Sequence, residues 1–253
     1  MKIFLDVGAH IGQTIDAVVA PKYEFDKIFC FEPCEESILQ LKQKQILDSR
    51  IEIQQFGLYK ENVKTTIFGK GDIGASIFKD HSSLENSSVP CETIQLIKVS
   101  DWFRDNLSED DEVYMKLNCE GCECDIINDL LDTGEYSKLT SVMIDFDVRK
   151  IPSKSKQEKF TRQRLADEGY KNYCYCEDVM VGGSHISRVR NWLDIVCADR
   201  CSHYTKIMHY LYVFVEIFKG QRSGLYFDLT IHLKRNSPQA MYGFIRYFYK
   251  LIK

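Results

Sequence analysis

The stretch KIFLDVGAHIGQTID, residues 2–16, decides the fold class of this chain. Its apolar run ends at Asp6 and predicts a buried strand, and Gly8 and Gly12 then predict a turn. Helical spacing follows Gly12 and ends before Pro21. The stretch therefore predicts a strand, a glycine turn and a helix, which form the first βα unit of a parallel sheet.

The alternation of strands and helices continues along the chain. Apolar segments that predict strands are separated by segments with helical spacing. The expected strands cover 27–33, 50–59, 112–118, 139–148 and 170–177, and the expected helices cover 34–46, 124–134 and 155–169. Repeated βαβ units predict an α/β fold, with a mostly parallel sheet and helices on both of its faces.

Residues 60–110 interrupt this alternation. Two segments in this range, 62–69 and 91–99, predict further strands, and the segment between them is rich in Gly and Ser. We expect an inserted pair of strands with a substrate loop, and a lid at 70–90 whose glycines act as hinges. This insertion and residues 182–195 are too irregular for the shape of a pocket to be derived from the sequence.

Charge divides the chain into two parts. The net charge of the whole chain is −4, yet residues 202–253 hold eight Lys or Arg and only two acids. We expect one domain at 1–200 and a basic, aromatic helical extension at 201–253. The extension either packs on the edge of the sheet or contacts anionic lipid at the membrane surface. The acidic remainder disfavours nucleic acid as a partner.

The chain contains ten cysteines, and its first residues read as a strand rather than as a secretory signal. We therefore expect reduced thiols in a cytoplasmic protein, peripheral to a membrane if the extension binds lipid. Cys119 and Cys122 form a Cys-x-x-Cys pair, but no second pair stands at the spacing of a zinc site. We expect no metal.

The glycine turn does not match the patterns that bind phosphates. A phosphate loop needs a lysine after its last glycine, and a dinucleotide site needs Gly-x-Gly-x-x-Gly, whereas this turn reads Gly8-x-x-x-Gly12. S-adenosylmethionine carries no phosphate and needs close backbone approach and an acid for its ribose hydroxyls. Asp6 and Glu32, after the first and second strands, stand where such acids are needed. An exposed acid at a helix start is the other interpretation of Glu32.

These segments resemble the FkbM-type methyltransferases, which are S-adenosylmethionine-dependent enzymes of class I with a Rossmann-like sheet. The resemblance rests on DVGAHIG, FEP, KLNCEGCECDII and VMIDFD, in the same order and spacing over roughly residues 3–150. It implies methyl transfer to a hydroxyl oxygen of a sugar, a glycan or a similar polar acceptor. It places six residues at the cofactor, with the last of them near the adenine: Asp6, Gly8, Ala9, Gly12, Glu32 and Gly57.

The sequence departs from this family at three places. Asn118 stands where the family carries Asp, and an amide is neither a general base nor a good ligand for a hard cation. His10 stands where Asn is more common. The family often has a helix before the first strand, whereas this sequence begins at the strand; we expect either a minimal enzyme or a shortened gene model.

The candidates for catalysis lie after the first and fourth strands. Glu120 and His10 are candidate bases for an alcohol acceptor, and Asn118 lies beside them. Glu120 could instead cap the next helix, and His10 could be an ordinary loop residue. Asp147, after the fifth strand, either lines the acceptor pocket or is an exposed acid. The alternative to an enzyme is a non-catalytic binding module, recruited to a membrane or to a glycan-assembly complex.

Overall fold

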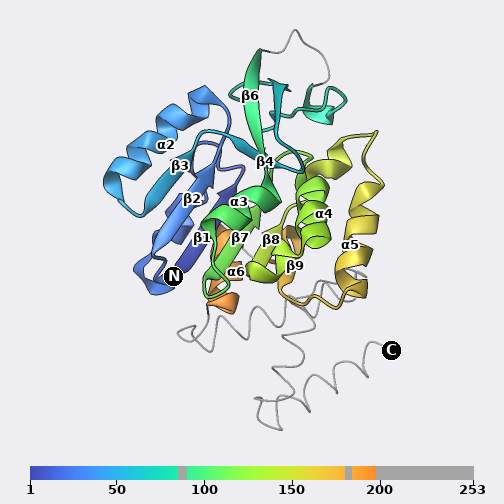
Figure 1. The fold of residues 1–253 in the computed structure, drawn as a ribbon. Helices are drawn as coiled ribbons and strands as arrows, with labels where there is room; N and C mark the ends of the chain where they lie inside the picture. Colours follow the sequence, from blue (N-terminus) through green and yellow to red (C-terminus); the bar gives the residue numbers. More distant parts are fainter. Residues whose placement is uncertain (85–89, 180–183, 198–253) are drawn as a thin grey trace, which may run out of the picture.

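The computed structural model describes residues 1–84, 90–179 and 184–197, and its centre is a six-stranded sheet (Figure 1). Every pair of neighbouring strands in this sheet is parallel. The strand order is β3-β2-β1-β7-β8-β9. The bounds are β1 Lys2–Val7, β2 Lys27–Phe31, β3 Ile51–Gln54, β7 Glu112–Leu117, β8 Leu139–Ile144 and β9 Tyr173–Tyr175. The order reverses between β1 and β7, where parallel α/β sheets bind their ligands.

Helices cover both faces of this sheet and bury two separate apolar cores. The helices α1 Ile15–Val18, α2 Glu35–Leu47 and α6 His185–Val196 contribute to one core. The helices α3 Val99–Asn106, α4 Glu123–Thr133 and α5 Gln157–Asp167 contribute to the other and lie in front of the sheet in Figure 1. Side chains alternate along β1, so Leu5 enters the second core and Phe4 the first. The predicted Rossmann-like α/β class, with a mostly parallel sheet and helices on both faces, is confirmed.

A second, three-stranded sheet is built from the insertion, and we call it the small sheet. It has the order β4-β6-β5, with β4 parallel and β5 antiparallel to β6. Its bounds are β4 Gly57–Tyr59, β5 Val63–Phe68 and β6 Cys91–Lys98. The two strands expected at 62–69 and 91–99 are therefore present and pair with each other.

The single strand expected at 50–59 is wrong, because the chain changes sheets within it. β3 ends at Gln54 in the large sheet, and β4 begins at Gly57 in the small sheet. The consecutive polar residues Gln54 and Gln55 break the alternation that Ile51 and Ile53 begin, and this break marks the crossing. A Cβ atom on Gly57 would lie 2.6 Å from Leu96 Cδ2, so a larger residue where β4 meets β6 would require Leu96 to shift.

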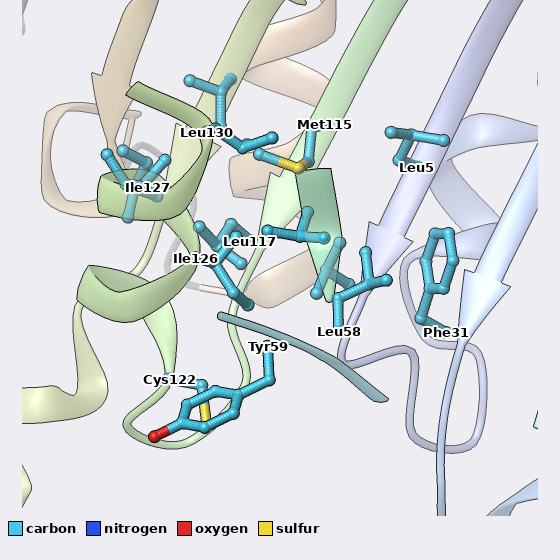
Figure 2. Close-up of a cluster of buried hydrophobic side chains, with 14 of the residues drawn as sticks. Leu5, Phe31, Leu58, Tyr59, Met115, Leu117, Cys122, Ile126, Ile127 and Leu130 are labelled. Atoms are coloured by element: carbon cyan, nitrogen blue, oxygen red, sulfur yellow. The ribbon is translucent and has the colours of Figure 1, made fainter. Parts of the chain in front are cut away.

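The small sheet packs against the carboxyl end of β7. Figure 2 shows Leu58 of β4 near Leu117 at the end of β7, within one apolar cluster that also includes Phe31. Tyr59 lies near Cys122 and Ile126 at the start of α4. This contact fixes the small sheet beside the end of the large sheet where a ligand is expected.

Short 3-10 helices complete the described fold: η1 Pro21–Tyr23, η2 Ser82–Leu84, η3 Glu135–Lys138, η4 Asp147–Lys150 and η5 Cys176–Val179. Residues 182–195, which looked irregular in the sequence, contribute most of α6, and Ser184 caps it by accepting a hydrogen bond from Ser187 N. The buried Trp192 of α6 donates from Nε1 to Ser141 Oγ at 3.0 Å on the sheet.

The extension expected at 201–253 lies outside the described residues, as does the last part of the expected lid at 85–89. Among the helices of the described ranges, none is long and apolar enough to cross a membrane.

Candidate functional site

One pocket opens at the carboxyl ends of β1, β2 and β7. Seven of the nine predicted site residues line it, and they come from four separate segments of the chain: Gly8, Ala9, His10, Glu32, Gly57, Asn118 and Glu120. Asp6, at the end of β1, and Gly12, at the end of the turn, are outside this lining. The structure therefore brings the predicted cofactor residues and the predicted catalytic residues to a single cavity.

The glycine turn is shaped by its packing. Gly8 and Gly12 have φ values of 78° and 84°, and His10 between them has 48°. A Cβ on Gly8 would lie 1.9 Å from Asn118 O of the chain after β7, and one on Gly12 would lie 2.9 Å from Leu41 Cδ2 of α2. Both glycines are thus required for close packing and for left-handed backbone, even before a ligand is considered.

Asp6 contacts the glycine turn through Lys116. Its side chain is fully buried and lies 3.1 Å from Lys116 Nζ, on the neighbouring strand. Lys116 also donates to Gly8 O at 2.8 Å and reaches the pocket. Burial raises the pKa of Asp6, and the Lys116 ammonium opposes that rise. Asp6 is outside the pocket lining, and its two side-chain partners, Lys116 and Thr14, both line the pocket.

Glu32 places its carboxylate on the β1–β2 side of the pocket. Its carboxylate is almost fully buried, with Oε2 accepting from His10 N at 2.8 Å and Oε1 from Cys34 N at 2.9 Å. Burial raises the pKa of Glu32, and these two backbone donors oppose the rise. The Cys34 side chain is a third partner of this carboxylate. A carboxylate has about four acceptor positions, so at least one is left for a ligand hydroxyl. Glu32 is thus a buried pocket residue rather than an exposed acid.

The helix after the turn is too short to bind a phosphate strongly. α1 has four residues, Ile15–Val18, so few aligned peptide dipoles point at the pocket. Thr14 before it lies 3.0 Å from His185 Nε2, and His185 lines the pocket from α6. Burial, followed by Lys116 and Arg188, lowers the pKa of His185 to about 4, which keeps this ring neutral near pH 7. Sequence reasoning missed His185 because α6 was not recognised.

An apolar wall closes the pocket beside Gly57. It is formed by side chains of the small sheet and of the loop after β5: Leu58, Ile67, Ile94, Leu96, Ala75 and Ile77. Burial of a flat aromatic group such as a nucleobase suits a surface of this kind.

Several polar and charged side chains lie beside the pocket on its β7–β8 side, and we call them the carboxylate cluster: Asn118, Glu120, Asp147, Lys150 and His81. Of these, Asn118 and Glu120 line the pocket. Lys150 Nζ lies 3.1 Å from Glu120 Oε2 and 3.0 Å from Asp147 Oδ1. Asn118 donates from Nδ2 to Asp147 Oδ2 at 2.7 Å. Burial first, and the neighbouring Asp147 second, raise the pKa of Glu120 to about 8, while Lys150 opposes the rise. A carboxyl group with such a pKa can exchange a proton near neutral pH.

Glu123, rather than Glu120, holds the turn before α4. Its Oε1 accepts from Cys119 N and Gly121 N, each at 3.0 Å, and its Oε2 accepts from Val148 N at 3.2 Å. This buried group binds the backbone as a helix cap would, and burial raises its pKa to about 7. The side chain of Glu120 is directed into the carboxylate cluster.

A loop at 69–84 covers the carboxylate cluster from the small sheet. Ser76 Oγ donates to Glu120 O at 2.7 Å, and Asp80 Oδ2 accepts from Ser153 N at 2.9 Å. The ammonium of Lys154 lies 4.0 Å from the centre of the Phe78 ring. Asp72, Ile73 and Ser76 of the same loop line the pocket. The described part of the expected lid therefore lies against the site.

The cysteine-rich turn after β7 is packed rather than open. Cys122 and Cys124 are buried, and burial raises the pKa of the Cys119 and Cys124 thiols. Across residues 1–84, 90–179 and 184–197, no group of three or more His, Cys, Asp or Glu side chains is arranged to hold a metal ion.

No protein-family model matches the chain, and no curated protein matches it. Among solved structures, the chain is similar to the crystal structure of "Methyltransferase FkbM" from Methylobacillus flagellatus KT, with 14% sequence identity and a TM-score of 0.39. The match covers 66% of this chain and 38% of that one, so this chain spans well under two thirds of its length. The fold assignment rests on the strand order and the two helical layers.

Proposed function

We propose that this chain is an S-adenosylmethionine-dependent methyltransferase that acts on a hydroxyl group of a sugar, a glycan or a similar polar acceptor. The observation that carries the proposal is the buried Glu32 carboxylate at the end of β2. It lines the pocket, and its protein donors do not use all of its acceptor positions, which suits the hydroxyls of a ribose.

A phosphate-free nucleoside fits this pocket better than a dinucleotide. The strand order matches that of dinucleotide-binding folds, so the order alone does not distinguish the ligands. A dinucleotide needs a helix N-terminus for its pyrophosphate, and α1 has only four residues. The turn also lacks the Gly-x-Gly-x-x-Gly spacing.

Different residues of the pocket would contact different parts of the ligand. Glu32 would hold the ribose, the apolar wall beside Gly57 would hold the base, and the turn from Gly8 to His10 would lie along the remainder. When bound, S-adenosylmethionine supplies a methyl group on a sulfonium, an activated electrophile for an oxygen nucleophile.

Glu120 is the group best placed to take the proton of the acceptor hydroxyl. It lines the pocket, its pKa of about 8 makes it a base near neutral pH, and Lys150 compensates the charge of the cluster. Asn118 and Asp147 line up beside it and can orient a polyhydroxyl acceptor through hydrogen bonds. Two carboxylates at this position disfavour an acceptor that carries phosphates, and therefore nucleic acid.

Calorimetry with S-adenosylmethionine and the full chain tests the cofactor assignment. We expect binding in the micromolar range, and we expect Glu32→Ala to weaken it at least about tenfold, the effect of losing a charged hydrogen-bond acceptor. Glu52→Gln, an exposed carboxylate on β3, is the matched control and should bind like the wild type. Absence of binding to the wild type, or unchanged affinity of Glu32→Ala, would overturn the assignment.

A non-catalytic binding module is the second candidate, and Asn118 is the observation that favours it. Its amide donates to Asp147, so the residue that would be an acid in the FkbM family serves here as a hydrogen-bond donor. Release of S-adenosylhomocysteine in the presence of a panel of glycans separates the two candidates. Cofactor binding without release on any glycan would favour the module.

A further inference from the structure

His81 reaches Glu120 from an element that is distant in the sequence. It belongs to the loop at 69–84, and its ring is completely buried. Its Nε2 lies 3.1 Å from Glu120 Oε2, the same oxygen that Lys150 approaches from η4. Three segments therefore meet at one carboxylate: the turn after β7, η4 after β8, and this loop.

The contacts of the other ring nitrogen fix the tautomer of His81. Ser83 N lies 3.3 Å from His81 Nδ1, and a backbone N–H can only donate. Ser83 Oγ lies 2.6 Å from the same nitrogen and 3.2 Å from Gly74 O, and its single proton can serve either acceptor, so the backbone N–H of Ser83 decides the tautomer. Nδ1 must then be the acceptor, and the proton of a neutral ring must be on Nε2.

The proton on Nε2 has one evident hydrogen-bond acceptor, the Glu120 carboxylate. Among the described residues, no atom completes a well-aligned hydrogen bond to His81 Nε2, although the nitrogen is buried. Buried donors are costly when they are left unpaired, and the nearest charged acceptor is Glu120 Oε2 at 3.1 Å. A small rotation of either side chain would align the pair.

We propose that His81 is a positioning residue for methyl transfer, which presents its Nε2–H to Glu120 and fixes the carboxylate that receives the proton of the acceptor hydroxyl. This inference rests on the proposed function of the pocket. In the reaction, the acceptor oxygen forms a bond to the methyl carbon while the bond from that carbon to the sulfonium sulfur breaks, which leaves S-adenosylhomocysteine. The O–H bond of the acceptor breaks, and its proton moves to Glu120. His81 neither gains nor loses a proton.

Four groups face Glu120 and decide how it responds to pH. Asp147 raises its pKa, Lys150 lowers it, and the Nε2–H of His81 stabilises the charged form. Asn118 is neutral and engages Asp147. Burial, followed by Lys150, lowers the pKa of His81 itself, so the ring stays neutral while Glu120 titrates. Loss of the His81 donor should therefore raise the pKa of Glu120.

The test is a carbon NMR titration of the full chain labelled at the glutamate carboxyl carbons, without cofactor or acceptor. The Glu120 signal is identified by its loss in Glu120→Gln. We expect His81→Leu, which removes the donor, to raise the Glu120 midpoint by about one pH unit. We expect His81→Gln, whose amide can donate in place of Nε2–H, to return the midpoint to within about half a unit of the wild type.

A second measurement covers the case in which His81→Leu does not fold. The imidazole nitrogen spectrum of the wild type should show His81 with Nε2 protonated and Nδ1 unprotonated. The opposite tautomer, or a Glu120 midpoint that is the same in His81→Leu and the wild type, would overturn the proposal.

The activity of the protein then tests the role in methyl transfer. If an acceptor is found, the pH–rate profile of His81→Leu should move by the same amount as the Glu120 titration, and His81→Gln should restore it. A titration that moves while the profile does not would overturn the positioning role. Because the titration needs no ligand, failure of S-adenosylmethionine to bind would overturn the proposed function and leave the His81–Glu120 contact measurable by itself.

Discussion

The two sides of the pocket hold their carboxylates in different ways. On the β1–β2 side, Glu32 accepts hydrogen bonds from two backbone donors. Cys34 N is two residues away in the sequence, and His10 N lies in the turn that follows the neighbouring strand β1. On the β7–β8 side, Glu120 is surrounded by side chains, among them Lys150 and His81, from separate parts of the chain. The first arrangement is set by local backbone shape, and the second depends on how distant segments pack.

This difference separates binding from reaction. A carboxylate held by backbone amides keeps a fixed direction, which suits a hydrogen-bond acceptor for a cofactor. A carboxylate between Asp147 and Lys150 has a raised pKa and changes charge near neutral pH, which suits proton transfer. Each of the following predictions tests one side of this comparison against the other.

The largest effect is expected from the proton acceptor. Glu120→Gln should lower the rate of methyl transfer at least about 100-fold, since it removes a general base, while leaving the affinity for S-adenosylmethionine nearly unchanged. Release of S-adenosylhomocysteine and calorimetry measure the two effects. The control is His10→Asn, which keeps a residue that tolerates the left-handed backbone of the turn. A loss in His10→Asn as large as in Glu120→Gln would place the base in the turn.

The next effect concerns the contact between the turn and β7. Gly8→Ala should lower the free energy of unfolding by about 3 kcal/mol, because it combines a left-handed φ with a clash against Asn118 O. Gly134→Ala is the matched control. Gly134 has a φ of 81°, similar to that of Gly8, but a Cβ there would have no neighbour within 4 Å, so we expect a loss of about 1 kcal/mol. Denaturant unfolding measures both; equal losses would show that the contact with Asn118 has no cost.

The smallest effect, when counted per pH unit, is a change in the free energy of unfolding with pH. Folded Glu120 keeps its proton up to about pH 8, whereas the unfolded side chain loses it above about pH 4.5. The unfolded state thus binds fewer protons in this window, and the free energy of unfolding of the wild type should fall as pH rises. Glu120→Gln lacks this loss, so it should gain on the wild type by about 1 kcal/mol per pH unit between about pH 5 and 8.

Thermal unfolding of the two proteins at several pH values measures that difference. The pKa of about 7 for Glu123 contributes to both proteins and cancels. Glu52→Gln, at an exposed position, should follow the wild type at every pH. A constant difference between Glu120→Gln and the wild type would show that Glu120 is ionised throughout this pH range.

Local patterns in the sequence were sufficient for most of the large sheet. The strands that begin at Lys2, Lys27 and Glu112 each coincide with an apolar run that has a clear end. The helix that ends before Gly134 has this glycine as its stop signal. Residues 50–59 do not form one strand, and the polar pair Gln54 and Gln55 followed by Gly57 is the local sign of the interruption. Which sheet a strand joins depends on its partner, β6, nearly 40 residues later, and no local pattern contains that information.

The candidate site, like the fold, could be predicted from the sequence where local patterns decide it and not where distant segments meet. The positions of Gly8, Ala9, His10 and Glu32 at one pocket follow from the turn and from the end of the next strand, which parallel pairing brings together. His81 and His185 could not be found, because one lies in a Gly- and Ser-rich loop and the other in a helix that was not recognised. Asp6 and Gly12 are outside the pocket lining, where Asp6 pairs with Lys116 and Gly12 packs against α2.

The contacts of Gly8 and Lys116 have a consequence for the order of folding. The turn that follows β1 takes its shape against Asn118 O and through the donation of Lys116 to Gly8 O, more than 100 residues later in the chain. Contacts of such long sequence separation form late, after the loop between them has been closed. A chain emerging from the ribosome therefore carries its glycine turn and Glu32 long before it can form the pocket, and nucleoside binding should begin only when β7 has joined the sheet.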